Sequence, residues 1–265
     1  MQAPRSFPTQ CQFFSVATHH TAAFCRIGVV CLLTFLGAAP ALGQHQLVRA
    51  NDTQEGEILG VSGTNIMVRV AAGEVGVPLA SVQRVVMPAP EAFGRGQSAM
   101  RENNYEAAIS ELQRVVDQFA GLPVDWARSA TAMLGDAYVG LGRFDEAEDT
   151  YQKFQSVYSG AEGSAQASVG MARVDLERGR LPEARARLEP ITELALKQLH
   201  ASADQGRVYT QAFLLLGRLE EAAGNPQQAL EHYMRAVAVF PQDAPSSQEA
   251  QERAAALQGQ NVVVP

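Results

Sequence analysis

The most suggestive chemical motif in the chain is a glycine-rich hexapeptide, Gly94-Arg95-Gly96-Gln97-Ser98-Ala99, with Asp117 downstream of it. A glycine pattern of this kind after a strand, followed about twenty residues later by an acid, is typical of a dinucleotide-binding turn. Here Pro88 and Pro90 separate the motif from the strand-like stretch before it, and no second parallel strand follows. We therefore interpret the hexapeptide as part of a helix and predict that the protein binds no cofactor.

The other residues that could carry chemistry are few and scattered. After residue 43 the chain has three histidines, His45, His200 and His232, and none stands at metal-ligand spacing to an acid or to another histidine. All three cysteines precede residue 44, so the rest of the chain has no thiolate for catalysis or metal binding. No nucleophile elbow, phosphate loop or pair of catalytic carboxylates can be singled out. We predict no catalytic residue, no metal site and no enzymatic activity.

The first 43 residues have the pattern of an export signal. Residues 1–26 contain two arginines and no acid, Ile27–Ala39 is an apolar run, and small residues precede Gln44. This order predicts a secretory signal peptide, residues 1–43, that is cleaved near Gly43-Gln44 and sends the protein to the periplasm or out of the cell. The alternative is an uncleaved signal that anchors the chain in the inner membrane, although the run is short for a membrane span.

The charge of the mature chain limits its partners. The whole chain has a net charge of −7, and without the two arginines of the signal it keeps 19 basic and 28 acidic residues, a net charge of −9. An acidic surface disfavours nucleic acid and anionic lipid as ligands. We predict no nucleic-acid partner and no membrane contact beyond the signal segment. The oligomeric state is left open.

Residues 44–87 predict a small β module, because the hydrophobic period there is two. Ile66, Val68 and Val70 alternate with Asn65, Met67 and Arg69, which gives a strand one buried face. We expect four strands and an additional edge strand at Leu47-Val48, separated by glycine-containing turns. The four runs rich in β-branched residues are Glu57–Val61, Ile66–Val70, Val75–Leu79 and Val82–Met87.

The spacing of glycines and β-branched residues in this module resembles that of SH3-like or Sm-like barrels. Two roles remain open for it. It could dock a partner, or it could cover the first helix of the segment that follows. Residues 88–90, with two prolines, form a stiff linker between the two segments.

The region after the linker is organised around Thr131–Phe154, which contains two helical patterns joined at Gly142. Gly142 can adopt a positive φ and end the first helix. Small residues at Gly135 and Ala147 let the two helices cross closely. The set of small and aromatic residues at fixed offsets is Leu134, Gly135, Tyr138, Gly142, Phe144, Ala147, Tyr151 and Phe154.

This set resembles the signature of the tetratricopeptide repeat, a helix-turn-helix unit of about 34 residues that stacks into a solenoid. The resemblance recurs on three other stretches. It implies a mainly α protein, a TPR-like α-solenoid of about four repeats plus a C-terminal capping helix over residues 91–258, preceded by the β-barrel-like module and followed by a tail, residues 259–265. The repeats are expected near 90–121, 126–160, 164–200 and 209–241.

Several details of the array can be predicted residue by residue. Asn103 stands where glycine is usual, and Asn104 is the expected N-cap of the next helix. Pro190 falls inside a helix and should kink it. Trp126 should be half-buried between repeats. The longer spacing of the signature glycines is assigned to the connections or to an extended second helix in repeat three.

Two helix starts are predicted nearer the C-terminus. Asn225-Pro226 is expected to be an N-cap followed by proline at the first helical position. Ser246 and Glu249 should form a capping box that opens the final helix, which ends at Leu257.

The resemblance implies a non-catalytic scaffold that binds a peptide or a partner helix in a concave groove lined by the first helix of each repeat. Its nearest analogy is to periplasmic repeat proteins of the bacterial cell envelope. The alternative function is an exported carrier or sensor that binds a small ligand or glycan through the β module. The groove positions of the repeat carry over to Phe93, Gln97, Arg101, Asp136, Val139, Arg173, Leu176, Glu177, Gln211, Arg218 and Glu221.

Overall fold

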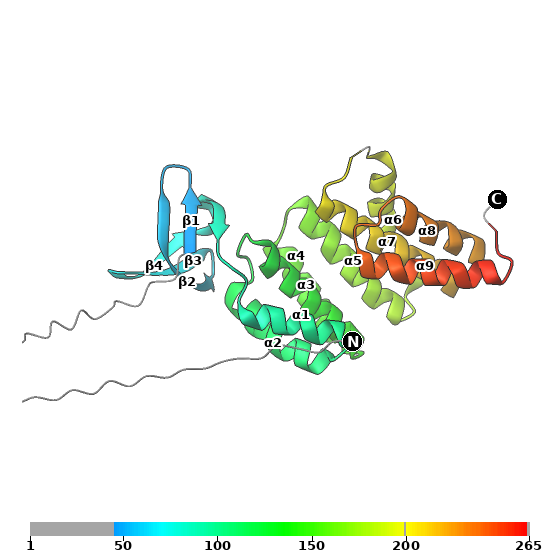
Figure 1. Cartoon of the computed structure of the whole chain (residues 1–265), viewed down its shortest axis with the longest axis horizontal. Coiled ribbons are helices and arrows are strands. Elements are labelled where there is room, and N and C mark those ends of the chain that lie inside the picture. The colour runs from blue at the N-terminus through cyan, green and yellow to red at the C-terminus, as the bar shows by residue number, and fades with distance from the viewer. Residues whose placement is uncertain (1–44, 199, 264–265) are drawn as a thin grey trace, which may run out of the picture. The chain divides into compact units, whose positions relative to one another are not determined.

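The computed structural model of the chain describes residues 45–198 and 200–263 (Figure 1). The predicted signal peptide lies outside these residues. Within them, five β-strands come first and nine α-helices follow. This confirms the predicted fold class, a helical array preceded by a small β module.

The β module is a single antiparallel sheet in which the strand order is β4-β3-β2-β1-β5. Alternate residues of the strands face one hydrophobic cluster, where Leu47, Ile58, Ile66 and Val68 are almost completely buried. The predicted alternation along Ile66–Val70 is thus confirmed at its first two apolar positions. The strands are β1 (His45–Arg49), β2 (Thr53–Ser62), β3 (Asn65–Val70), β4 (Gly73–Pro78) and β5 (Val82–Val86).

Two predictions about this sheet were wrong. Leu47-Val48 does not form an edge strand, because β1 pairs with β2 on one side and with β5 on the other. Leu79 does not belong to a strand, because it begins a short 3₁₀ helix, Leu79–Ser81. Ser81 Oγ donates a hydrogen bond to the Pro78 carbonyl at 2.7 Å, which closes this tight turn between β4 and β5.

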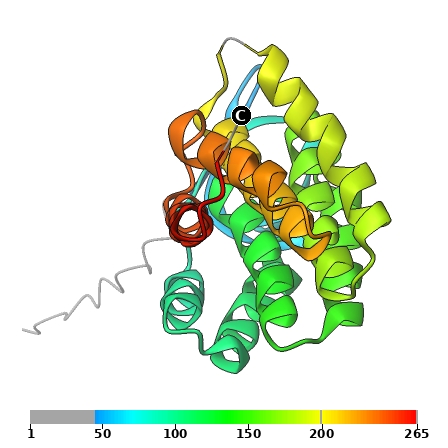
Figure 2. The same cartoon turned by 90° about the vertical axis from the view of Figure 1, so that its right-hand side faces the viewer.

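The helices alternate as the first and second members of four antiparallel pairs, and α9 packs on α7 and α8 (Figures 1 and 2). We call α1, α3, α5 and α7 the first helices, and α2, α4, α6 and α8 the second helices. Their bounds are α1 (Glu91–Arg101), α2 (Tyr105–Phe119), α3 (Asp125–Gly140), α4 (Phe144–Val157), α5 (Ala161–Glu177), α6 (Leu181–Lys197), α7 (Ala203–Ala222), α8 (Pro226–Ala238) and α9 (Ala244–Gly259).

Each first helix ends in the same left-handed turn. The residue at the turn has a positive φ: 55° at Asn103, 70° at Gly142, 72° at Gly179 and 79° at Gly224. At each turn the next backbone N–H reaches the carbonyl five residues back, as from Arg143 to Tyr138 at 2.9 Å. These are the bonds of a Schellman C-cap, and they reverse the chain into the second helix. The predicted roles of Gly142 and Asn103 are confirmed.

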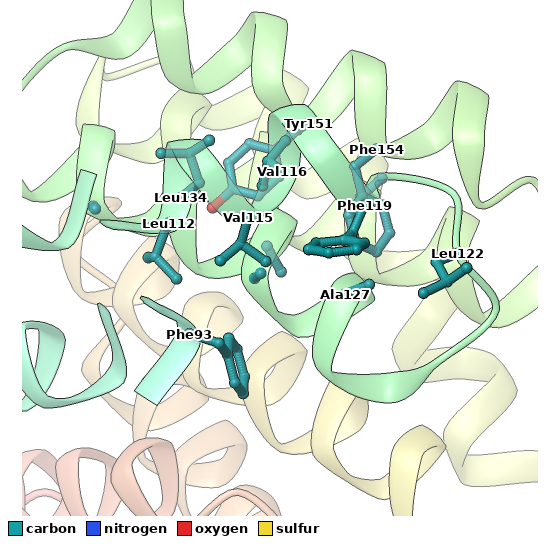
Figure 3. Close-up of a cluster of buried hydrophobic side chains, with 14 of the residues drawn as sticks. Phe93, Leu112, Val115, Val116, Phe119, Leu122, Ala127, Leu134, Tyr151 and Phe154 are labelled. Carbon is teal, nitrogen blue, oxygen red and sulfur yellow. The ribbon is translucent and has the colours of Figure 1, made fainter. Parts of the chain in front are cut away.

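Glycines at the helix crossings leave room for aromatic rings. A Cβ on Gly135 of α3 would lie 2.6 Å from the Tyr151 ring, and one on Gly170 of α5 would lie 2.2 Å from it. Tyr151 is therefore enclosed between two consecutive first helices. It belongs to a buried cluster that also contains Leu134 and Phe154 and that continues into the β module (Figure 3). The small residues predicted at these crossings thus have a direct steric reason.

The β module rests on the first repeat. Gln118 of α2 donates through its side-chain amide to the Leu59 carbonyl of β2 at 2.6 Å. The next residue, Gly60, has a φ of 148°, and a Cβ there would lie 2.4 Å from the Gln118 carbonyl. Only glycine at position 60 allows so close an approach of the β2 and α2 backbones. Trp126 donates from its indole N–H to the Met87 carbonyl at 3.2 Å and is half-buried, as predicted.

Of the three predicted helix starts, one N-cap is confirmed, one is confirmed in position but makes no capping bond, and one is wrong. Asn104 caps α2 by accepting a hydrogen bond from the Ala107 N–H, as predicted. Asn225 occupies the N-cap position of α8, but its side chain makes no capping bond and instead donates to Glu220. The predicted capping box at Ser246 is wrong, because Asp243 caps α9 and accepts from the Ser246 N–H. Because Asp243 is the N-cap and Pro245 lies in the first turn, α9 begins at Ala244, before the predicted cap Ser246.

The extra length of the fourth repeat lies in α7 itself. Gly217 comes 14 residues after the first residue of α7, whereas Gly135 comes 10 residues after the first residue of α3. A capping box between Ser202 and Gln205 starts α7 early. The assignment of all the extra residues to the connections and to α6 was therefore incomplete. The second helix α6 is long, 17 residues, and continues through Pro190.

Candidate partner-binding face

Four of the six charged residues predicted for the groove pair with one another across successive first helices. Asp136 of α3 forms an ion pair with Arg173 of α5. Glu177 of α5 pairs with Arg218 of α7 at 2.6 Å. We call these contacts, together with the α7–α9 pair described next, the ion-pair series.

The series ends at α9, where Glu221 of α7 meets Arg253 at 3.1 Å. Arg253 also binds Glu249 of its own helix at 2.9 Å. Two pairs of the series join an acid on one first helix to an arginine on the next first helix, and the third joins an acid on α7 to an arginine on α9. These carboxylates and guanidinium groups already have partners, so they stabilise the stacking of the repeats and offer little free charge to a ligand.

Two buried tyrosines support two of the three acids of the series, Asp136 and Glu221. The Tyr151 hydroxyl donates to Asp136 Oδ1 at 2.6 Å, and the Tyr233 hydroxyl donates to Glu221. Burial, with the nearby acid, raises the pKa of both tyrosines, so the hydroxyls stay protonated and act as donors. The Asp136 carboxylate raises the pKa of Arg173. Asp136 and Glu221 are therefore each held by a phenol and by a guanidinium.

The other predicted residues have different surroundings. Phe93 is only 8% exposed and its ring packs against the Trp126 ring, with 6.4 Å between centroids. It belongs to the core, which leaves little of its side chain for contact with a partner. Val139 and Leu176 are half-buried, and Gln97 and Arg101 of α1 are exposed. Gln211 is half-buried and lines a cleft.

That cleft lies toward the N-terminal ends of three consecutive first helices. It measures about 60 Å³ and is lined by Ser129 of α3, Gln166 of α5 and Gln211 of α7, with Arg128, Asp204, Arg207 and Val208 around them. Arg128 of α3 bridges to Asp204 of α7 at 3.1 Å. The structure thus places one hydroxyl and two amides, each from a different repeat, around one space. We call Ser129, Gln166 and Gln211 the polar triad.

The polar triad could have been found from the sequence. Each of its members stands six residues before the small residue at the helix crossing, which is Gly135, Ala172 or Gly217. These three residues occupy equivalent positions in their repeats, and only Gln211 among them was predicted to bind a partner. Side-chain amides and hydroxyls both donate and accept, so the triad can satisfy a peptide backbone without a net charge.

A larger cleft of about 710 Å³ shares the lining residue Arg128 with the small cleft of the triad. Its walls come from the α2–α3 and α4–α5 connections and from Gln205 of α7, and they include the apolar side chains of Pro123, Val157 and Tyr158. Tyr158 is held in place because its hydroxyl accepts a hydrogen bond from the Gly121 N–H at 3.0 Å. Together the two clefts offer a polar space beside a partly apolar one, which suits an extended segment of another protein.

The buried acids of the second half of the array are structural. Asp175 is 2% exposed and pairs with Arg180 at 2.6 Å and with Arg187 at 2.8 Å. Glu220 is equally buried and pairs with Arg185 at 2.7 Å. Asp175 takes the place where the repeat usually has an aromatic residue, and the two arginines explain how a carboxylate is tolerated there. None of these acids lines the clefts described above.

The histidines do not form a metal site in the described part of the chain. His232 stacks on Phe213 in the α7–α8 pair, and burial lowers its pKa. His45 is engaged in the sheet, where its Nδ1 accepts a hydrogen bond from the Ile58 N–H at 3.0 Å. Among residues 45–198 and 200–263, no group of three or more histidine, cysteine or acidic side chains could hold a metal ion. No helix in these two ranges is long and apolar enough to cross a membrane.

Comparison with known families identifies the array. The tetratricopeptide repeat model matches residues 93–162, 132–191 and 169–247, which together span more than half of the chain. The chain belongs to the tetratricopeptide repeat family. TPR repeats are generally non-catalytic scaffolds for protein–protein interaction, and we assign this class of function to the array.

Other comparisons add little to this assignment. No curated protein matches the chain. The solved structures that match include the crystal structure of MamA, with 15% identity over 63% of this chain and 94% of that chain and a TM-score of 0.36.

Proposed function

We propose that the protein is a non-catalytic scaffold of the bacterial cell envelope that binds an extended segment or helix of a partner protein along its first helices. The observation that supports this most directly is the polar triad, in which three successive repeats each contribute one uncharged hydrogen-bonding side chain to one cleft. A site built by three repeats requires the stacked array, which is what a TPR scaffold provides.

The ion-pair series sets the chemistry of the proposed ligand. Because Asp136, Glu177 and Glu221 are already neutralised by arginines, a strongly charged segment would find no unpaired counter-charge among them. The polar triad and the apolar wall of the larger cleft instead favour a segment with a free backbone and small apolar side chains. Such binding should depend only weakly on ionic strength.

A capture experiment with matched variants tests this proposal. Gln166→Glu/Gln211→Glu adds two charges to the triad without a change in side-chain size. Because a carboxylate only accepts hydrogen bonds, both positions lose the amide donors that would bind peptide carbonyls, and capture of the partner by in-cell cross-linking should fall at least about tenfold.

The control for this experiment is Gln152→Glu/Gln155→Glu, which adds the same charges to two exposed positions of the second helix α4. This variant should capture the same proteins as the wild type. Equal capture by both variants and the wild type would contradict the proposed site.

We also propose that the β module is an SH3-like barrel that covers the first repeat. Three observations support a covering role: the Gln118–Leu59 hydrogen bond, the tight approach of Gly60 to α2, and the Trp126–Met87 hydrogen bond. An array end that is covered in this way does not expose its core to water.

The proposed location follows from the sequence of the first 43 residues. We propose cleavage between Gly43 and Gln44, with export to the periplasm. The intact mass of protein purified from the envelope fraction should then correspond to residues 44–265. A mass that includes the first 43 residues would favour the anchored alternative, and recovery only from the cytoplasmic fraction would contradict export.

A further inference from the structure

An ion pair crosses the candidate partner-binding face between two repeats that are not neighbours in the chain. Arg128 of α3 meets Asp204 of α7 at 3.1 Å, so the contact joins the second repeat to the fourth and spans the third. We call this contact the bridge. Its two side chains retain only 22% and 35% exposure, so solvent screens the pair less than it screens a pair on the open surface.

The bridge forms because α7 begins one helical turn early. Gly217 comes 14 residues after the first residue of α7, whereas Gly135 comes 10 residues after the first residue of α3, and about four residues make one turn. Asp204 is the second residue of α7, so it lies in this added turn. The added turn therefore supplies the acid that reaches Arg128.

Residues at the bridge line both clefts of this face. Arg128 lines the small cleft of the polar triad as well as the larger cleft. Asp204 lines the small cleft, and the next residue, Gln205, lines the larger one. A segment that extends from the larger cleft to the triad must therefore pass the bridge.

The sizes of the two clefts show what the bridge does to a ligand. Ligand sites commonly measure about 300–1,000 Å³, and the larger cleft, at about 710 Å³, lies in this range. The small cleft measures about 60 Å³, which is room for only a few water molecules, since one water occupies about 30 Å³ in the liquid. With the bridge in place, the polar triad is too enclosed for the backbone of a partner segment.

Opening of the bridge leaves neither charge without a partner. Arg128 also pairs with Asp125 of its own helix at 3.0 Å, and Asp204 also pairs with Arg207 of its own helix. Breaking a buried ion pair is costly chiefly because one charge stays unpaired. Here each side keeps a second partner, so the open and closed states of the bridge differ by a small free energy.

We propose that the bridge is a gate that controls access to the polar triad. This inference rests on the proposed function, because it assigns the regulation of the same cleft. In the closed state a partner segment is held only in the larger cleft, and in the open state the segment also reaches Gln166 and Gln211. The affinity for the partner then scales with the populated fraction of the open state.

A thiol placed in the small cleft tests the gate without any partner. Ser129→Cys introduces a cysteine of similar size at the triad, and mass spectrometry of its peptide follows its labelling separately from the three native cysteines. The ratio of the labelling rates with a bulky maleimide and with N-ethylmaleimide reports access, because the thiolate fraction affects both rates equally. Asp204→Ala removes the bridge and should raise this ratio about three- to tenfold.

The matched control is Asp125→Ala, which removes the other acid that pairs with Arg128 and leaves the bridge in place. Both acids lie in the first turn of a first helix, so both substitutions remove one negative charge from a helix N-terminus. Asp125→Ala should leave the ratio unchanged. Ser156→Cys, at an exposed position of α4, gives the ratio for an open site, which neither substitution should alter.

Circular dichroism checks that each protein is folded, and Gln166→Cys is the second probe of the same cleft if Ser129→Cys is not. An unchanged ratio in Asp204→Ala, or an equal rise in Asp125→Ala, would overturn the gate whether or not a partner binds there.

Capture by in-cell cross-linking then connects the gate to the partner. Asp204→Ala should capture about three- to tenfold more of the partner than the wild type, and unchanged capture would overturn the regulatory role. The Gln166→Glu/Gln211→Glu variant separates this result from the proposed function. If that variant captured as the wild type does while Asp204→Ala raised the labelling ratio, the proposed function would be contradicted and the gate would stand.

Discussion

Replacement of Gly170 by alanine is expected to destabilise the array by about 1–3 kcal/mol, because it overpacks a closed crossing. The added Cβ would lie 2.2 Å from the Tyr151 ring. This ring cannot move away easily, because it is 2% exposed, packs against Gly135 on its other side and is tied to Asp136 through its hydroxyl. The midpoint of urea unfolding measures the effect.

Gly94→Ala provides the control for this prediction. Gly94 lies inside α1, and a Cβ there would meet no atom within 4 Å. The same change of residue should therefore stabilise the protein by up to about 1 kcal/mol, since alanine is the better helix former. If Gly170→Ala raised the midpoint as Gly94→Ala does, the close contact between α5 and Tyr151 would be wrong.

Replacement of Asp136 by alanine should cost about 2–3 kcal/mol. It leaves the Arg173 guanidinium without its counter-charge and the Tyr151 hydroxyl without its acceptor. Breaking a fully buried ion pair costs about 3–5 kcal/mol, but the Asp136 and Arg173 side chains retain 30% and 20% exposure, so solvent screens part of the loss.

Two further variants separate this ion pair from a general effect of charge. Glu193→Ala removes a partner of Lys197 from a pair whose side chains are 67% and 74% exposed, and it should cost at most about 0.5 kcal/mol. Asp136→Leu/Arg173→Met removes both charges and should recover much of the stability lost in Asp136→Ala. Equal small losses in Asp136→Ala and Glu193→Ala would show that the series does not hold the repeats together.

Local patterns in the sequence were enough to predict the helical pairs. The positive φ at Gly142, the Asn104 cap and the small residues at helix crossings depend on neighbours within one repeat, so their residue types indicate their structure. The Ser202–Gln205 capping box carried an equally local signal for the early start of α7, and it was overlooked.

Contacts between repeats could not be predicted in this way. The pairs Asp136–Arg173 and Glu177–Arg218 join residues that are 37 and 41 positions apart, and nothing in the local pattern selects one arginine over another. The burial of Phe93 could not be predicted for a related reason. Its groove position is valid inside an array, but in the first repeat Trp126 packs against it. The central place of β1 likewise depends on pairing with β5, far along the chain.

Photo-cross-linking from single positions tests the central claim, that a partner protein lies along the first helices, most directly. A photoreactive amino acid is placed in cells at Gln211, beside the polar triad, or at Gln155 on the outer side of α4. The proposed function predicts a discrete cross-linked protein from position 211 and none from position 155. The same product from both positions, or one from position 155 alone, would contradict a partner-binding face on the first helices.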